Sequence, residues 1–166
     1  MSTTTRHETE IIADPSLPTI EILREFDAPR ERVYRAWTDP ELVAQWLGPK
    51  STTMRIDTWD CRTGGSWRYV AIQDGEEIAS FFGSFHEVRP DDRLVQTFTF
   101  EGFPDGVSLE TMTFADLPGG RTRARCLSVV DTMEARDAIL SSGMDVGVNE
   151  GYEKLDALLA DPAANQ

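Results

Sequence analysis

The stretch that most constrains the fold is residues 132–160, near the end of the chain. Its apolar residues are separated by four, four, three and four positions, namely Met144, Val148, Tyr152, Leu155 and Leu159. This spacing predicts one apolar face of a long α-helix. Asp131 and Glu134 have the spacing of a capping box, so we expect helical structure to begin there. Because no other long apolar helix is predicted, the rest of the chain is expected to wrap around this one.

Three glycines, Gly143, Gly147 and Gly151, recur every four residues beside that apolar face. A glycine in a helix interior costs about 1 kcal/mol relative to alanine. The cost indicates that backbone or a bound molecule comes close to this side of the helix. We interpret the row as tight packing against strands, with Gly143 separating a short helix from a long one. Contact with a bound molecule is the alternative.

Residues 53–130 have the pattern of strands separated by turns. The turn sequences are Gly64-Gly65, Asp74-Gly75, Pro90-Asp91-Asp92, Pro104-Asp105-Gly106 and Pro118-Gly119-Gly120. They delimit six strands at about 53–60, 66–73, 77–89, 93–101, 107–116 and 121–130. Short connections favour antiparallel pairing of neighbours. With a further strand at 19–26, the sequence predicts a seven-stranded antiparallel sheet.

Two short helices are predicted directly after the first strand. Pro29 suits a helix start, and Val33, Ala36 and Trp37 give the first helix an apolar stripe. Asp39-Pro40 restarts a helix that Gly48-Pro49 ends. A sheet with one apolar face must be covered, so we expect an α+β fold in which a curved sheet grips the C-terminal helix. Residues 1–18 are interpreted as a flexible arm, with an edge strand at Glu10-Ile11-Ile12 as a weakly indicated alternative. Residues 19–160 are interpreted as one domain and 161–166 as a tail.

The composition limits the classes of partner. The chain has 29 acidic and 16 basic residues, a net charge of −13, which disfavours nucleic acid and membrane surfaces as partners. Residues 1–10 lack the apolar core of a signal peptide, and no apolar run is long enough to span a bilayer, so a cytoplasmic location is expected. Cys61 and Cys126 are isolated, so two free thiols are favoured over one disulfide, and no metal site is predicted. No phosphate-binding loop is present, and no cofactor is expected.

Four motifs in order along the chain resemble those of a known family. They are Ala36–Glu41 with Trp46–Pro49, Gly64–Tyr69, Gly83–Pro90 with Arg93–Val95, and Gly143-Met144 with Gly147, Tyr152 and Leu155. The chain resembles bacterial proteins similar to the C-terminal domain of the activator of heat-shock protein 90 ATPase. These belong to the SRPBCC superfamily of START domains, birch-pollen-allergen-like proteins and polyketide cyclases. The resemblance implies a helix-grip fold and a hydrophobic ligand cavity. It implies neither chaperone activity nor a shared set of catalytic residues.

A cavity is also expected from the residues themselves. Ala124, Cys126 and Ser128 form a row of small residues on one strand face, opposite the helix glycines, and would leave space between sheet and helix. The alternative is a solid core filled by large aromatic side chains. We expect the cavity wall to contain Trp67, Tyr69, Phe98, Met112, Phe114, Cys126, Met144, Val148 and Tyr152.

His86 is the one polar group that the sequence assigns to this cavity. Alternation places it on the strand face of Phe82, Ser84 and Val88, where it would orient a ligand or move a proton if that face is inward. A partly exposed strand histidine is the simpler interpretation.

Three functions remain open from the sequence. The first is binding of a small apolar or aromatic molecule, without catalysis. The second is a cyclase-, aromatase- or hydrolase-like enzyme using His86 or Tyr69 as acid or base. The third is a co-chaperone-like interaction module with an exposed patch around Trp37, Trp46 and Phe103. A homodimer through the outer sheet face is compatible with each of them.

Overall fold

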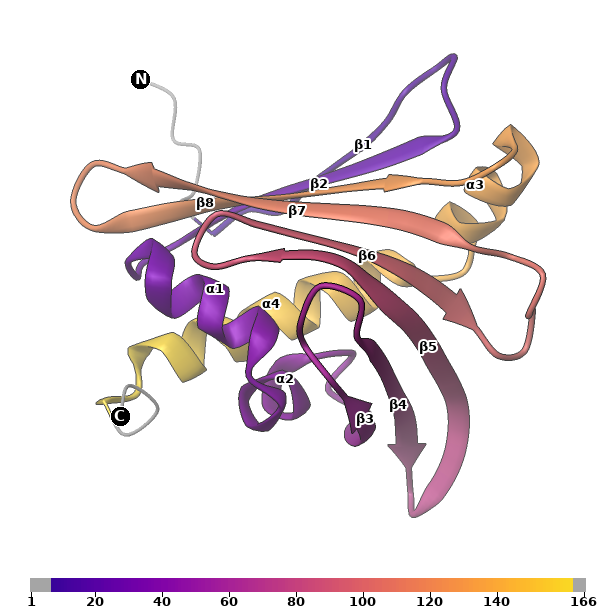
Figure 1. The fold of residues 1–166 in the computed structure, drawn as a ribbon, viewed down its shortest axis with the longest axis horizontal. Coiled ribbons are helices and arrows are strands. Elements are labelled where there is room, and N and C mark those ends of the chain that lie inside the picture. Colours follow the sequence, from indigo (N-terminus) through magenta and orange to yellow (C-terminus); the bar gives the residue numbers. More distant parts are fainter. Residues whose placement is uncertain (1–6, 163–166) are drawn as a thin grey trace.

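One curved antiparallel sheet surrounds a long C-terminal helix (Figure 1). The computed structural model describes residues 7–162. The strands are β1 (Glu10–Ala13), β2 (Thr19–Phe26), β3 (Thr53–Trp59), β4 (Ser66–Gln73), β5 (Glu76–Arg89), β6 (Arg93–Phe100), β7 (Ser108–Leu117) and β8 (Arg121–Val129). The helices are α1 (Arg30–Thr38), α2 (Pro40–Trp46), α3 (Met133–Ser141) and α4 (Met144–Ala160). The expected α+β class and the two short helices after β2 are confirmed.

The sheet has eight strands rather than the seven expected, in the order β1-β2-β8-β7-β6-β5-β4-β3. The additional strand, β1, pairs antiparallel with β2 from Glu10↔Leu23 to Ala13↔Ile20. It is a four-residue edge strand with mostly exposed side chains, so it leaves almost no alternation in the sequence. Part of the expected N-terminal arm is therefore sheet. Residues 1–6 of that arm and 163–166 of the expected tail lie outside the described residues.

The curvature of the sheet creates an inner side that α4 runs along (Figure 1). Strands β3, β4 and β5 bend away from the plane of β2, β7 and β8, while α1 and α2 lie beside α4 at one end. Side chains of β2 alternate strictly between partly buried and buried. This is the period-two pattern of a sheet covered on one side. No helix within residues 7–162 has the length and apolar character needed to cross a membrane.

The first of the two C-terminal helices is capped by a different residue from the one the sequence indicates, whereas the break between the two helices lies where expected. The Thr132 hydroxyl caps α3 by accepting from the Ala135 backbone N–H at 3.0 Å, so the capping residue is Thr132 and not Asp131. Gly143 has φ 85° and separates α3 from α4, as expected from its sequence position. That left-handed conformation strains residues with a Cβ, which explains glycine here.

The other two helix glycines are approached from α2 and the loop after it, not from the strands we expected. A Cβ at Gly151 would lie 3.0 Å from the backbone oxygen of Trp46. A Cβ at Gly147 would lie 3.6 Å from the nearest atom of Pro49, which is an ordinary contact. Gly151 therefore permits a close backbone approach, whereas Gly147 does not require one.

This difference predicts opposite effects of two alanine substitutions on α4. We expect Gly147→Ala to stabilise the protein by up to about 1 kcal/mol, because alanine costs less conformational entropy in a helix. We expect Gly151→Ala to destabilise it by about 1–2 kcal/mol, because the methyl group presses on backbone that cannot rotate away. Urea denaturation of both variants measures the difference, and equal stabilisation would contradict this account of Gly151.

The helix is also joined to the sheet by a buried ion pair. The guanidinium of Arg24, on the inner face of β2, donates to both carboxylate oxygens of Asp156 on α4, at 2.6 and 3.0 Å. The Arg24 side chain is 3% exposed, and its guanidinium lies over the rings of Phe26 and Tyr152 at 5.0 and 5.9 Å from their centroids. A charge in this position needs its partner.

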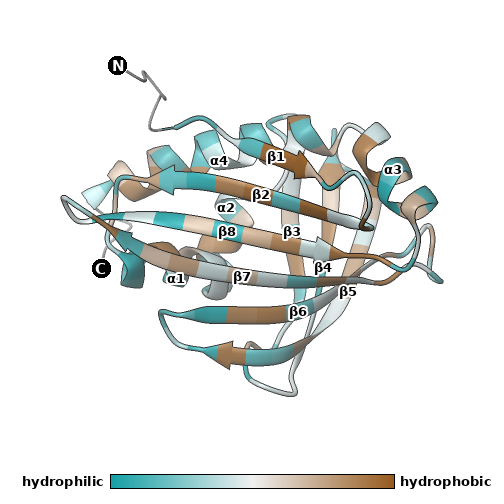
Figure 2. Cartoon of the chain, turned by 90° about the horizontal axis from the view of Figure 1, so that it is seen from above, coloured by the Kyte–Doolittle hydropathy of each residue, from teal (hydrophilic) through white to brown (hydrophobic). Residues whose placement is uncertain are grey.

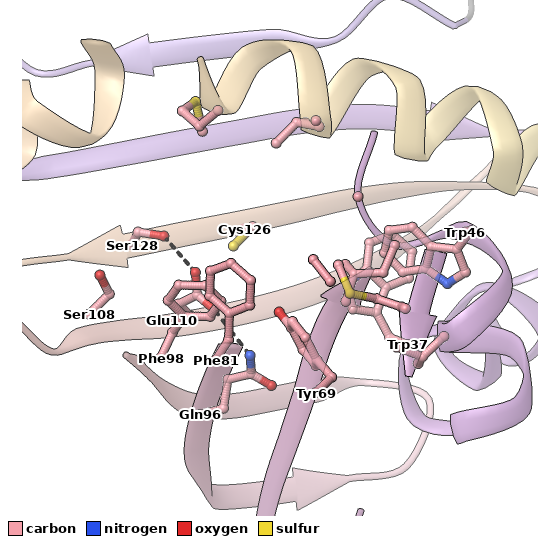
Figure 3. Close-up of a pocket in the computed structure, with 18 of the residues that line it drawn as sticks. Trp37, Trp46, Tyr69, Phe81, Gln96, Phe98, Ser108, Glu110, Cys126 and Ser128 are labelled. Carbon is pink, nitrogen blue, oxygen red and sulfur yellow. Dashed lines mark hydrogen bonds between the residues drawn. The ribbon is translucent and has the colours of Figure 1, made fainter. Parts of the chain in front are cut away.

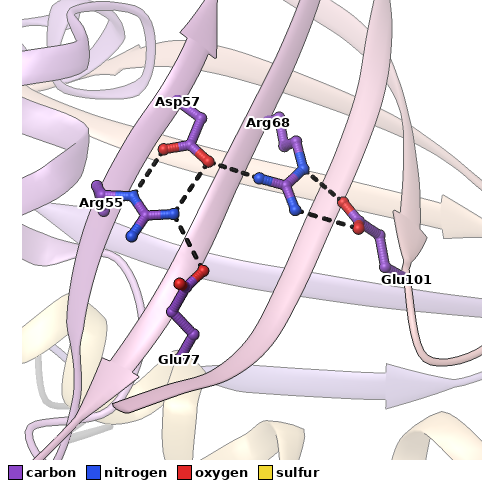
Figure 4. A network of polar contacts seen from close by, with 5 residues as sticks. All are labelled: Arg55, Asp57, Arg68, Glu77 and Glu101. Carbon is purple, nitrogen blue, oxygen red and sulfur yellow. Dashed lines mark hydrogen bonds and ion pairs between the residues drawn. The ribbon is translucent and has the colours of Figure 1, made fainter. Parts of the chain in front are cut away.

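The outer side of the sheet carries charged side chains where β3, β4 and β5 face solvent. Hydrophilic and hydrophobic residues alternate along the strands (Figure 2). Arg55 and Arg68 form a network of ion pairs with Asp57, Glu77 and Glu101 (Figure 4). Because these groups are accessible to water, the network adds little stability, but it fixes which face of the sheet is outward. Arg55, Asp57 and Arg68 therefore lie on the outer face of the sheet.

Candidate functional site

A cavity of about 500 Å³ lies between the inner face of the sheet and α4 (Figure 3). Residues from β2 to β8 form most of its wall, and the four helices and the loop between α2 and β3 contribute the rest. Protein interiors are normally packed as densely as organic crystals, with few voids larger than a water molecule. The interior is therefore hollow, and the alternative of a solid core is wrong.

Eight of the ten residues that the sequence assigned to the site line this cavity. They are Trp67, Tyr69, Phe98, Met112, Cys126, Met144, Val148 and Tyr152. They come from β4, β6, β7, β8 and α4, which the curved sheet brings together around one space. Ser128 and Gly147, from the row of small residues and the row of glycines, line it as well. The small residues of the sheet and the glycine of the helix thus both border the cavity, as expected.

His86 does not line the cavity, and the expectation that it supplies the polar group there is wrong. Its side chain is exposed on the outer face of β5, whereas the neighbouring Phe85 is 1% exposed. A β-bulge between Phe85 and Glu87 shifts the pairing of β5 with β6. Such a bulge adds one residue to the strand and reverses the alternation beyond it. His86 and the core residue Val88 therefore lie on opposite faces, although they are two residues apart.

Phe114 is the second predicted residue that lies away from the cavity. It is 3% exposed and packs edge-on against Tyr34 and Trp37, with ring centroids 5.4 Å apart in both pairs. Phe114 thus fills the core between β7 and α1. Phe114 lies on the inner face of β7, as predicted. Its position further along the strand than Met112 places it beyond the end of the cavity.

The exposed tryptophan patch that an interaction module would use is absent from the described residues. Trp46 is 4% exposed, and its indole N–H donates to the backbone oxygen of Ala36 at 2.8 Å. Trp37 is half-buried, with its ring centroid 4.7 Å from that of Trp46. Both line the cavity, and only Phe103 of the three is exposed. These three residues therefore do not form the exposed patch that the interaction-module hypothesis requires.

A row of three polar residues crosses the cavity wall. None of them was among the predicted site residues, although one belongs to the row of small residues noted in the sequence. Gln96 on β6 pairs with Glu110 on β7, which pairs in turn with Ser128 on β8. The Gln96 amide donates to one carboxyl oxygen of Glu110 at 3.0 Å, and the Ser128 hydroxyl donates to the other at 3.2 Å. Figure 3 shows both hydrogen bonds beside Phe81 and Phe98. Neighbouring strands thus hold the Glu110 carboxyl in a fixed position.

The environment of Glu110 changes its acidity. Burial raises the pKa of this carboxyl above its ordinary value, and the hydrogen bonds from Gln96 and Ser128 oppose that rise. The residue is only partly buried by surface area, but it lines the cavity, so its accessible part faces the hollow interior. Among the described lining residues, none is Lys, Arg or His. Among the lining residues that the structure describes, Glu110 is therefore the only one whose ordinary pKa would leave its side chain ionised at neutral pH.

Four aromatic rings form a continuous wall next to this row. Trp67 stacks on Tyr69 with centroids 4.8 Å apart, and Phe98 lies 5.7 Å from Trp67. Phe81 joins Tyr69 at 5.4 Å and Phe98 at 5.3 Å. Such rings offer flat apolar surface for a ligand and a negative π face to any positive group.

The other titratable groups of the wall are held neutral. Burial, with the nearby charge of Glu110 as the next cause, raises the pKa of the Tyr69 phenol and of the Cys126 thiol well above their ordinary values. Tyr69 is therefore suited to donating a hydrogen bond and not to accepting a proton as a base. Since His86 lies outside the cavity, it is not placed to act as an acid or base there. No cluster of three or more His, Cys, Asp or Glu residues suited to a metal ion occurs within residues 7–162.

Comparison with known proteins identifies relatives over most of the chain. Residues 27–160 match the family described as activator of Hsp90 ATPase homolog 1-like protein. A solved structure from Rhodobacter sphaeroides is 27% identical with a TM-score of 0.84, covering 92% of this chain and 99% of its own. One from Arthrobacter aurescens is 28% identical with a TM-score of 0.83, covering 95% and 94%. One from Chromobacterium violaceum is 30% identical with a TM-score of 0.74, covering 86% and 99%. No curated protein matches the chain.

Proposed function

The chain belongs to the family of activator of Hsp90 ATPase homolog 1-like proteins, and we propose that its cavity binds one small, largely apolar or aromatic molecule. The observation that carries this proposal is the cavity itself, because a folded chain gains stability by filling such a space. Its volume of about 500 Å³ falls in the range typical of small-molecule sites.

The wall has the composition of a ligand site. Most of the lining residues are aliphatic or aromatic, and the polar side chains converge on Glu110 from β6 and β8. Apolar surface supplies affinity by leaving water, while a few fixed polar groups select orientation. The aromatic wall of Trp67, Tyr69, Phe81 and Phe98 would contact a planar ligand.

Binding of a neutral, fluorescent apolar probe tests the proposal. We expect N-phenylnaphthylamine to bind the protein in a one-to-one complex with increased fluorescence. In Val148→Phe, a larger side chain enters the cavity from α4, and affinity should fall by at least about tenfold. Val148 is a lining residue, so this variant reduces the space without removing a polar group.

The matched control for this test is Val146→Phe on the same helix. Val146 is 52% exposed and does not line the cavity, so the same substitution should leave probe affinity unchanged. Thermal unfolding of both variants shows whether they remain folded. Absence of probe binding to the unmodified protein, or equal loss in both variants, would contradict the proposed function.

A further inference from the structure

The described residues that line the cavity include one acidic side chain and no basic one. Glu110 brings a carboxyl into it, and the described wall offers no lysine, arginine or histidine as a partner. The two hydrogen bonds that Glu110 accepts come from neutral groups, the Gln96 amide and the Ser128 hydroxyl. A carboxylate surrounded by apolar surface is unfavourable unless an opposite charge or hydrogen-bond donors offset its lost hydration. The missing component of this site is therefore a positive group.

Glu110 also has acceptor capacity left for such a group. An ionised carboxylate accepts about four hydrogen bonds, two on each oxygen. Gln96 uses one position on one oxygen and Ser128 one position on the other. These two bonds come from the strands on either side of β7 and fix the carboxyl in the plane of the wall. A donor that enters from the cavity would meet a fixed pair of oxygens.

The surrounding rings favour the same kind of group. Tyr69, Phe81 and Phe98 lie on the Glu110 side of the cavity (Figure 3), and they are linked by centroid distances of 5.3–5.4 Å. The faces of aromatic rings attract cations, most strongly where water is excluded. A carboxylate set among aromatic walls is thus suited to an ammonium group attached to an apolar body.

On the premise that the cavity binds a small molecule as proposed above, we infer that its ligand is a lipophilic amine whose protonated nitrogen pairs with Glu110. The ammonium group donates to the free acceptor positions of the carboxylate, and the hydrocarbon or aromatic body occupies the space between the Trp67–Tyr69 stack and α4. Fatty acids and other apolar anions are excluded, because they would place a second negative charge beside Glu110 without a cation in the described wall.

Three probes of matched shape test this inference: phenylbutylamine, phenylbutanol and phenylbutyrate. They share one hydrocarbon body and differ in the charge of the end group. Calorimetry or displacement of N-phenylnaphthylamine at neutral pH should show the amine binding at least about tenfold more tightly than the alcohol, and the acid more weakly than the alcohol.

Glu110→Gln provides the variant for this test, with nearly the same shape and no charge. We expect it to weaken binding of the amine at least about tenfold and to change binding of the alcohol by less than about threefold. Thermal unfolding of the variant is the control that it remains folded, and the ratio of amine to alcohol affinity within each protein is the quantity compared. If the variant does not fold, the order of the three probes on the unmodified protein still decides the inference.

The outcomes separate the two proposals. If N-phenylnaphthylamine and the alcohol bind but the amine has no advantage, the inference about amines is wrong and the proposed function stands. An advantage of the amine that persists in Glu110→Gln would equally overturn the role of Glu110. If neither the probe nor any of the three compounds binds, the proposed function fails and the inference with it.

Discussion

Replacement of Asp156 by alanine is expected to lower the free energy of unfolding by about 2–3 kcal/mol, because it leaves the buried guanidinium of Arg24 without its partner. Arg24 is 3% exposed and donates to both carboxylate oxygens of Asp156. A guanidinium remains charged at any ordinary pH, so the uncompensated charge cannot be removed by loss of a proton. The expected value lies below that of a fully buried pair, since Asp156 is 27% exposed and water reaches it.

Glu153→Ala on the same helix is the matched control. Glu153 pairs with Lys50 at 2.6 Å, which equals the shorter distance between Arg24 and Asp156. Both side chains of the Glu153–Lys50 pair, however, are 57% exposed. Its loss should cost much less, because water replaces the missing carboxylate. Urea denaturation measures both variants. A loss in Asp156→Ala no larger than in Glu153→Ala would show that the Arg24–Asp156 pair does not hold α4 to the sheet.

The main elements of the fold could be predicted from the sequence because they depend on local chemistry. Turns such as Asp74-Gly75 demand residues that tolerate positive φ, and the structure has φ 53° and 79° at these two positions. The alternation of Ile20, Ile22 and Phe26 identifies the inner face of β2. The same alternation places Arg24 on that face, but its partner Asp156 is distant along the chain. Sequence spacing carries no information about such a pairing.

The edge strand and the bulge show where local patterns fail. β1 is too short and too exposed to alternate, so the sequence indicates an edge strand at Glu10-Ile11-Ile12 only weakly, and the pairing with β2 that stabilises it is not specified. The assignment of His86 to the cavity required the face of Phe82, Ser84 and His86 to be inward, but all three are exposed, so this is the outer face of β5. The bulge after Phe85 instead places Val88, which a regular strand would put on the face of His86, on the inner side of the sheet.

Strand alternation alone would have placed the polar residues of the cavity wall on the inner face of the sheet. Glu110 precedes Met112 by two residues on β7, and Gln96 precedes Phe98 by two on β6, so alternation places both on the inner face. Ser128 was already in the row of small residues. Charged residues are rarely buried, so the residue type of Glu110 argues against the inner face that its position indicates. Their assembly depends on the register of three strands, which the sequence does not specify.

The buried carboxyl of Glu110 predicts a second large effect, on the pH dependence of stability. Its pKa is raised in the folded protein by burial, so the folded state keeps this proton to higher pH than the unfolded chain does. The stability from this group is fully present below the ordinary glutamate pKa and is lost as pH rises through the folded pKa. The slope for one proton reaches at most about 1.4 kcal/mol per pH unit.

The prediction is tested on the difference between the unmodified protein and Glu110→Gln. Carboxyls such as Asp27 have lowered pKa values because of paired arginines, and they change stability in the opposite direction as pH rises. Subtraction of the variant's curve removes these contributions. We expect Glu110→Gln to gain stability relative to the unmodified protein as pH rises from about 4 towards neutrality, starting near the ordinary glutamate pKa.

Urea denaturation at a series of pH values measures this difference, and Glu76→Gln serves as the control for loss of an exposed carboxyl. A lipophilic amine that pairs with Glu110 should reduce the gain, because its charge offsets the cost of the carboxylate only in the unmodified protein. A difference between the two proteins that stays constant with pH would show that Glu110 titrates alike in the folded and unfolded states. The carboxyl would then be hydrated in the cavity, and the site would lack the unpaired buried charge from which selection of a cation was inferred.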